Sequence, residues 1–137
     1  MKKIVLIVML FTKSILANDI TVEVSELINE KGKLSIGLYN QNDDTFADMT
    51  KHYKGVHLII DKMKIVYTFQ DVPNGTYAIS IFHDENENEI LDKNFFGMPK
   101  EGYGFSNNIR PTFRGATFEE SKFDVKNSQI IKIIIGY

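Results

Sequence analysis

Oxygen-bearing side chains recur at every second position in the segment FHDENENEILD, residues 82–92. Asp84, Asn86 and Asn88 alternate with other residues, and Asp92 follows four positions after Asn88. Hard cations such as Ca²⁺ take roughly six to eight oxygen ligands, and a short loop supplies them from alternate positions. The pattern predicts a candidate calcium site formed by Asp84, Asn86, Asn88, the carbonyl group of Ile90, and Asp92.

The match to an EF-hand calcium loop is partial. With Asp84 as the first position, Glu89 stands where the sharp turn needs glycine, and Phe95 stands where a bidentate glutamate belongs. The set supplies about five oxygens, with water or Glu101 to complete it, so the expected affinity is weak, on the order of 10⁻⁴–10⁻³ M. The alternative left open is that these side chains bond to their own backbone and shape the loop without a metal.

Aromatic residues crowd the segment after this loop. They could line a pocket for a sugar or a small apolar ligand, but we expect them to pin the loop onto the domain. Arg110 and Arg114 are expected to form ion pairs within the loop rather than to bind an anion. The aromatic residues are Phe95, Phe96, Tyr103, Phe105, Phe113 and Phe118.

Catalytic chemistry has weaker support. Two carboxylates among Asp84, Asp92 and Glu101 could serve as acid and base of a hydrolase, provided that they face each other across a cleft. Ser106 has no recognisable nucleophile context. The chain has no cysteine, and its three histidines lack the spacing of a zinc site. We therefore predict no catalytic residue and no cofactor other than calcium.

Residues 1–17 have the pattern of an export signal. Lys2 and Lys3 precede an apolar run over residues 4–11, and Ala17 ends a small-residue cleavage site. The prediction is a leader over residues 1–17 and one domain over residues 18–137, located in the periplasm or secreted. The later apolar segments have the length of strands, so no stable membrane span is expected after cleavage.

The charge of the predicted mature chain narrows the range of partners. Without Lys2, Lys3 and Lys13, 13 Lys and Arg residues face 18 Asp and Glu residues, a net charge of 13 − 18 = −5. This acidic balance argues against nucleic acid and anionic lipid as partners. It is compatible with the binding of a cation.

Most of the domain alternates between apolar and polar residues, which is typical of half-buried strands. The segment Asp71-Val72-Pro73-Asn74-Gly75 is a strong turn signal between two such runs, so residues 64–83 are expected to form a hairpin. Asn127-Ser128 is expected to join the last two strands as a second hairpin. The alternating runs cover residues 20–24, 34–38, 56–60, 65–69, 77–81, 123–125 and 131–135.

These runs predict an all-β domain, a single antiparallel β-sandwich of about seven strands with one long ordered loop at residues 84–118. Residues 45–54, TFADMTKHYK, are a candidate for a short helix or turn. Residues 130–135 are a candidate edge strand that we expect to be buried in the sheet.

Several segments resemble known families. VPNGTYAI at Val72–Ile79 resembles the hairpin of transthyretin-like and carboxypeptidase-regulatory-like sandwiches. The segments at residues 82–92, 96–108 and 111–118 resemble the bacterial domain-of-unknown-function family 2141. That resemblance covers nearly all of the chain after residue 17. It implies an exported immunoglobulin-like or prealbumin-like sandwich and no known activity. Where the family tends to have glycines in the acidic loop, this chain has Glu87 and Glu89, which weakens the case for a tight cation loop.

The sequence thus favours an exported, non-enzymatic binding or accessory module. Its working surface is the loop at residues 84–118, stiffened by weakly bound calcium, and its expected partner is a protein or glycan of the cell envelope. Two alternatives stay open. One is a small hydrolase of envelope polysaccharide that uses Asp84, Asp92 or Glu101, and the other is a purely structural module of an assembly.

Overall fold

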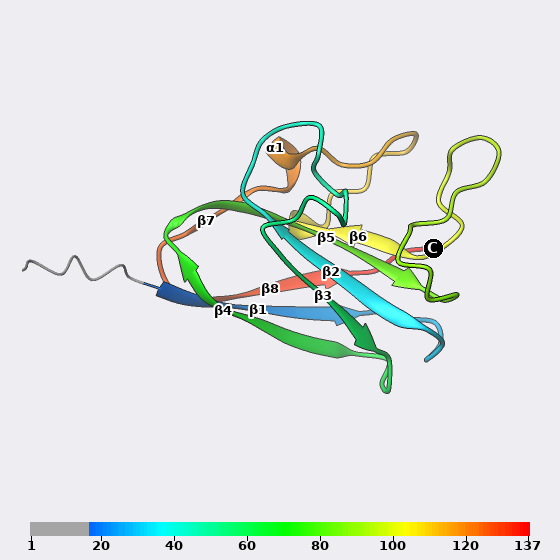
Figure 1. Ribbon diagram of the computed structural model, residues 1–137, viewed down its shortest axis with the longest axis horizontal. Coiled ribbons are helices and arrows are strands. Elements are labelled where there is room, and N and C mark those ends of the chain that lie inside the picture. Colours follow the sequence, from blue (N-terminus) through cyan, green and yellow to red (C-terminus); the bar gives the residue numbers. More distant parts are fainter. Residues whose placement is uncertain (1–16) are drawn as a thin grey trace, which may run out of the picture.

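Residues 17–137, the part of the chain that the computed structural model describes, form two β-sheets packed face to face (Figure 1). The three-stranded sheet has the order β4–β1–β8, and the five-stranded sheet has the order β3–β2–β5–β6 with β7 also paired to β5. This architecture confirms the predicted all-β sandwich. The strands are β1 (Ala17–Ser25), β2 (Lys33–Tyr39), β3 (Lys54–Ile59), β4 (Ile65–Pro73), β5 (Gly75–Asp84), β6 (Tyr103–Phe105), β7 (Phe123–Val125) and β8 (Gln129–Ile134).

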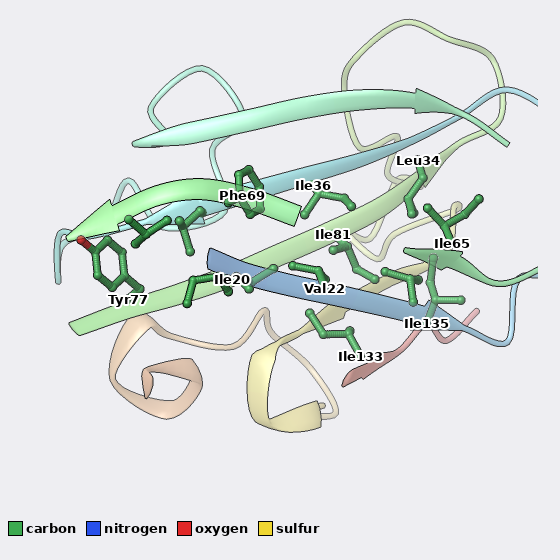
Figure 2. Packing of buried hydrophobic residues seen from close by; sticks show 14 of the residues in the cluster. Ile20, Val22, Leu34, Ile36, Ile65, Phe69, Tyr77, Ile81, Ile133 and Ile135 are labelled. Carbon is green, nitrogen blue, oxygen red and sulfur yellow. The ribbon is translucent and has the colours of Figure 1, made fainter. Parts of the chain in front are cut away.

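The core lies between the two sheets and is built from the predicted alternation. On β1, Ile20, Val22 and Val24 are completely buried, while the residues between them are partly exposed. Figure 2 shows the side chains of Ile20 and Val22 meeting those of Leu34, Ile36 and Ile81 from the other sheet. Burying large aliphatic side chains stabilises the folded state by about 1.5–3 kcal/mol each, which makes this layer the main source of stability.

Strand β5 is buried on both faces. Ile79 and Ile81 point into the core, whereas Ala78 and Phe82 point to the opposite face of the five-stranded sheet. That outer face is covered by loops and by α1 (Phe118–Ser121), whose Phe118 packs with Tyr39 and Ala78. The sandwich therefore carries an extra layer on one side, above β2 and β5 (Figure 1).

The predicted hairpin at residues 64–83 is wrong. The turn is present, but β4 pairs with β1 and β5 pairs with β2, so the chain crosses from one sheet to the other at Asn74. Just before the crossing, β4 carries a bulge, where Asp71 has a positive φ of 57°. A bulge increases the local twist and bends the strand, which directs β4 away from its sheet and towards β5.

The predicted hairpin around Asn127-Ser128 is also wrong. β7 pairs with β5 in one sheet and β8 pairs with β1 in the other, and the β1–β8 pair is parallel rather than antiparallel. Residues 130–135 were expected to be buried in the sheet. Instead β8 is an edge strand, with Ile130 and Ile134 largely exposed and Ile133 buried.

Two further predicted segments can be compared with the structure. Residues 45–54 form turns, one of the two forms predicted for this segment. The long loop at residues 84–118 is interrupted by β6 and by the 3₁₀ turn η1 (Ser106–Asn108). The predicted export signal lies outside the described residues except for Ala17, which begins β1, so that prediction stays a prediction.

Candidate functional site

The acidic loop begins at Asp84, the last residue of β5, which is completely buried. One carboxylate oxygen accepts a hydrogen bond from the backbone N–H of Asn88 at 3.2 Å, and the other accepts from Glu89 at 2.7 Å. A buried carboxylate with a backbone donor on each oxygen is well satisfied. Asp84 therefore folds the following residues back over the end of its own strand.

Asp92 is the second centre of the acidic loop. Its carboxylate accepts from the side-chain amide of Asn86 at 2.6 Å and from that of Asn88 at 3.0 Å. The amide oxygen of Asn88 accepts from the backbone N–H of Ile90, as in an Asx turn. The structure thus brings the predicted side chains Asp84, Asn86, Asn88 and Asp92 into one hydrogen-bonded network, and the network is satisfied by N–H donors.

Glu87 and Glu89 occupy two positions whose backbone conformation favours glycine. Glu87 and Glu89 have positive φ values of 58° and 62°, the left-handed region that glycine adopts without steric cost. The side chain of Glu87 lies 3.9 Å from Lys33, and that of Glu89 lies 4.0 Å from His57. The loop therefore keeps a conformation suited to glycine although both residues are glutamates.

Glu101 forms hydrogen bonds with the backbone at both ends of the acidic loop. It is 8% exposed, and its carboxylate accepts from the backbone N–H groups of Glu85 and Asp92, each at 3.2 Å. Burial raises the pKa of Glu101 above its ordinary value, and the negative charges of Asp92 and Asp84 raise it further, against the effect of the two N–H donors. The residue predicted to complete a calcium shell acts here as an anchor of the loop.

Within residues 17–137, no group of three or more His, Cys, Asp or Glu side chains is arranged to hold a metal ion. The calcium set is of another kind, with two carboxylates, two amides and the carbonyl group of Ile90, and it stays a prediction. A cation at Asp92 would have to replace the two amide donors, so Asn86 and Asn88 would have to turn their oxygens towards it.

Beyond Asp92 the loop forms a narrow hairpin, residues 93–100, which we call the tip. Lys93 forms a bridge with Pro99, and the side-chain oxygen of Asn94 accepts from the backbone N–H groups of Phe96 and Met98. Gly97 has a φ of 76°, which closes the turn. The tip is therefore an ordered turn that presents the side chains of Phe95 and Phe96.

A cavity of about 470 Å³ lies over the outer face of the five-stranded sheet, and we call it the loop cavity. Its floor is formed by Phe82, Tyr103 and Phe105. Three loop segments surround it, and this volume is within the usual range for small-molecule sites, roughly 300–1,000 Å³. The surrounding residues are Phe46, Ala47, Asp48, Met49 and Thr50, then Glu89, Ile90, Leu91, Lys93, Gly97, Met98 and Pro99, and finally Phe113, Arg114, Gly115 and Ala116.

The six aromatic residues predicted to pin the loop divide into two groups. Phe105 and Phe118 are buried, and Tyr103 is half-buried, so these three fulfil the expectation. In contrast, Phe95 and Phe96 at the tip and Phe113 in the third wall are 97%, 84% and 89% exposed. The pinning prediction is therefore wrong for Phe95, Phe96 and Phe113, whose rings are exposed.

The two arginines also differ. Arg114 forms the predicted ion pair, but its partner is Glu120 of α1 rather than a residue of the loop, with two contacts at 2.8 and 2.7 Å. Arg110 instead lies over the ring of Tyr103, 4.4 Å from its centroid, and donates to the Tyr103 carbonyl. This contact is a cation–π interaction rather than an ion pair.

His57, His83 and Ser106 contact other groups of the fold rather than the loop cavity. His57 lies 2.7 Å from the hydroxyl of the buried Ser35 on the neighbouring strand, and His83 is completely buried. Ser106 is buried as well, where its hydroxyl accepts from the backbone N–H of Ile79 at 2.9 Å. Because none of these four residues lines the loop cavity, their polar groups have no access to a ligand bound there.

Sequence reasoning missed the wall at residues 46–50. This segment lies more than thirty positions before the acidic loop, and only the fold brings the two together. The pattern Asp-x-Thr, which occurs twice, was the available signal, since Asp43 and Asp48 each accept from the backbone N–H two residues later, both at 2.8 Å. Such turns fix the backbone of an irregular segment firmly enough to form a wall.

One of three comparisons with known proteins found a match. The family model described as "Uncharacterized protein conserved in bacteria (DUF2141)" matches residues 22–132. The chain belongs to the DUF2141 family. The match extends from β1 into β8, so this DUF2141 domain includes the acidic loop, the tip and all the walls of the loop cavity. A search of the curated proteins and one of the solved structures found no match.

No helix in residues 17–137 is long and apolar enough to cross a membrane.

Proposed function

We propose that this DUF2141 domain is a non-enzymatic binding module that takes up an apolar group of its partner in the loop cavity. The observation that carries the proposal is the cavity itself, about 470 Å³ over a rigid sheet, with an apolar floor and walls from three loops. Binding residues are commonly carried on loops that a rigid scaffold positions. The walls also include two methionines, Met49 and Met98, whose flexible side chains adapt to the shape of an apolar ligand.

The three carboxylates predicted for a hydrolase, Asp84, Asp92 and Glu101, do not support hydrolysis in the loop cavity. A hydrolase of envelope polysaccharide needs two carboxylates that face a substrate across a cleft. Asp84 and Glu101 are buried, and with Asp92 they accept hydrogen bonds from groups of their own loop. None of the three lines the loop cavity, so these carboxylates have no position from which to attack or protonate a ligand there.

The partner that we propose is a protein of the cell envelope that presents an aromatic or aliphatic side chain. This choice rests on the export signal predicted at residues 1–17 and on the apolar floor of the cavity. A glycan is the second candidate, because the exposed ring of Phe113 at the rim offers a sugar face a surface for stacking. Weakly bound calcium remains part of the proposal as a stiffener of the wall at residues 89–92.

The test measures binding of the apolar dye anilinonaphthalene sulfonate. Leu91→Asp places a charge in a cavity wall, and Ile130→Asp places the same charge on the exposed face of the far sheet as a matched control. We expect Leu91→Asp to weaken dye binding at least tenfold and Ile130→Asp to leave it unchanged. Thermal melts of both variants would establish that the sandwich is intact.

Two results would contradict the proposal. Equal dye binding by both variants would place the apolar site outside the loop cavity. Hydrolysis of a peptidoglycan or polysaccharide substrate by the wild-type protein, lost in Asp92→Asn, would favour the hydrolase instead. Displacement of the dye by a soluble glycan but not by apolar peptides would identify the glycan as the partner class.

A further inference from the structure

The tip presents a pair of aromatic rings that contact little else in the domain. Phe95 is 97% and Phe96 84% exposed, and the two rings contact each other edge to face with centroids 5.6 Å apart. Asn94 and Gly97 fix the turn that carries them, as described above. An ordered turn that holds two phenylalanines in water leaves their apolar surface available to a partner.

A third exposed ring stands on the neighbouring loop. Phe113 is 89% exposed in the segment at residues 109–117. Gly97 to Pro99 of the tip and Phe113 line the same cavity, so both loops stand at its rim. In Figure 1 both loops project beyond the sheets as convex lobes, on the side away from the three-stranded sheet.

Charge is distributed unevenly between these loop ends and the rest of the chain. Residues 93–100 and 109–117 contain four basic and no acidic residues, although the whole chain has a net charge of −2. The acidic residues of the loop lie at its base, in residues 84–92 and at Glu101. Arg114 is neutralised by Glu120, whereas Lys93 and Lys100 form no ion pair with residues 17–137.

We propose that the loop ends at residues 93–100 and 109–117 dock on the surface of an anionic lipid bilayer. Phe95, Phe96 and Phe113 would enter the boundary between headgroups and acyl chains, and Lys93 and Lys100 would lie among the lipid phosphates. Aromatic residues combined with lysine are the usual means of interfacial membrane binding. The net negative charge of the chain, which argued against anionic lipid, does not describe this local surface.

Shape and charge together favour a bilayer over a protein as the occupant. A protein partner would need a concave apolar site that fits two separate convex lobes, whereas a fluid bilayer adapts to them. The lysines at both ends of the tip also suit a layer of phosphates below the level of the rings. The proposal goes beyond the binding function of the cavity, because it states on which surface the module works.

The experiment uses tryptophan as a reporter, since the chain contains none. Phe95→Trp places a probe at the tip, and Ile130→Trp places a matched probe on the exposed face of the far sheet. Each protein is mixed with vesicles of phosphatidylcholine and phosphatidylglycerol in a 3:1 ratio. We expect a blue shift of the emission for Phe95→Trp that salt weakens, and no shift for Ile130→Trp.

Vesicle sedimentation measures the contribution of each side chain. We expect Phe95→Ser with Phe96→Ser to lower the partition coefficient at least tenfold, from the lost burial of two rings. Lys93→Gln with Lys100→Gln should reduce binding to anionic vesicles and leave binding to pure phosphatidylcholine unchanged. Ile130→Ser with Ile134→Ser is the control that removes two exposed apolar side chains elsewhere.

The proposal is overturned if wild-type protein does not sediment with either vesicle, or if the paired Phe95 and Phe96 changes leave sedimentation unaltered. Capture of a soluble envelope protein that needs both rings, without vesicle binding, would assign the tip to a protein partner instead. Phe95 and Phe96 do not line the loop cavity, so the dye test of the binding function fails or succeeds independently.

Discussion

The hydroxyl group of Tyr137 lies 2.6 Å from Nδ1 of His83, a side chain that is completely buried. The other ring nitrogen, Nε2, lies 2.7 Å from the carbonyl oxygen of Lys31. A carbonyl oxygen only accepts, so Nε2 carries the proton, and in the neutral ring Nδ1 accepts from Tyr137. Through His83, strand β5 is thus connected to the β1–β2 loop and to the residues after β8.

Tyr137→Phe removes the only donor to Nδ1 of His83 among residues 17–137. A buried acceptor left without a partner costs about 1–3 kcal/mol, so we expect the unfolding free energy to fall by that amount. Tyr67→Phe is the control, because the hydroxyl of Tyr67 makes no hydrogen bond within residues 17–137 and the ring is half-buried. Urea unfolding of both variants provides the measurement. Equal losses would mean that the hydrogen bond to His83 contributes nothing specific.

Ser106 and Ser128 offer a matched pair of serine substitutions. The hydroxyl of each accepts a backbone N–H at 2.9 Å, from Ile79 and from Asp19 respectively, but the first bond is buried and the second exposed. Water can replace the lost partner only at the exposed site. We therefore expect Ser106→Ala to destabilise the domain by about 1–3 kcal/mol and Ser128→Ala by less than about 0.5 kcal/mol. Similar melting temperatures for the two variants would contradict this reasoning.

The strands could be predicted from the sequence because burial follows the two-residue period of a strand, as in Ile20, Val22 and Val24. Which strands pair with one another could not be predicted from the sequence. The turn at residues 71–75 has the same local chemistry whether the next strand returns to the same sheet or crosses to the other. The choice depends on the bulge at Asp71 and on core contacts made by residues distant in sequence.

The candidate site was predictable to a similar extent. The spacing of Asp84, Asn86 and Asn88 correctly indicated an ordered turn, since short polar side chains act on nearby backbone groups. The loop cavity depends on contacts of long range, and its wall at residues 46–50 carries no pattern that points to residues 89–99. Exposure of the rings at Phe95 and Phe96 likewise depends on the tip projecting away from the sheets.

Arg114 and Glu120 provide a pH-dependent contact in the third wall of the loop cavity. Hydrogen bonds from the Arg114 side chain, followed by the backbone N–H of Thr117, lower the pKa of Glu120 from 4.5 to about 2. A lowered pKa means that this contribution to stability is present above the ordinary pKa and is lost as the pH falls towards 2. We expect Arg114→Gln to move the Glu120 titration midpoint upwards, as measured by carboxyl NMR. An unchanged midpoint would show that the ion pair does not form in solution.

Replacing Glu87 or Glu89 of the acidic loop with glycine should leave the stability of the fold unchanged or raise it. Glu87 and Glu89 adopt left-handed backbone conformations that cost a side-chain-bearing residue about 1–2 kcal/mol, partly offset by the greater unfolded-state entropy of glycine. We expect Glu87→Gly and Glu89→Gly to change stability by about 0 to +1 kcal/mol in thermal melts. Glu85→Gly, which has no positive φ, is the control and should be destabilising. A clear loss of stability at position 87 or 89 would mean that the pairs with Lys33 and His57 outweigh the strain.

Calcium is the remaining test of the acidic loop, and its expected effect follows from the weak affinity predicted for Asp84, Asn86, Asn88, Ile90 and Asp92. Free calcium at a hundredfold excess over the dissociation constant would stabilise the fold by about 2.7 kcal/mol. We expect 10 mM calcium chloride to raise the melting temperature of the wild-type protein, and the rise to disappear in Asp92→Asn.

Asp19→Asn, an exposed carboxylate in β1, is the matched control and should keep the calcium response. Magnesium at the same concentration controls for ionic strength, because this smaller ion demands a tighter octahedral shell than the loop provides. If calcium and magnesium give the same melting temperature, the amide donors of Asn86 and Asn88 remain on Asp92. Hydrogen bonds alone would then hold the loop wall, and any change in ligand affinity with calcium would have to arise outside it.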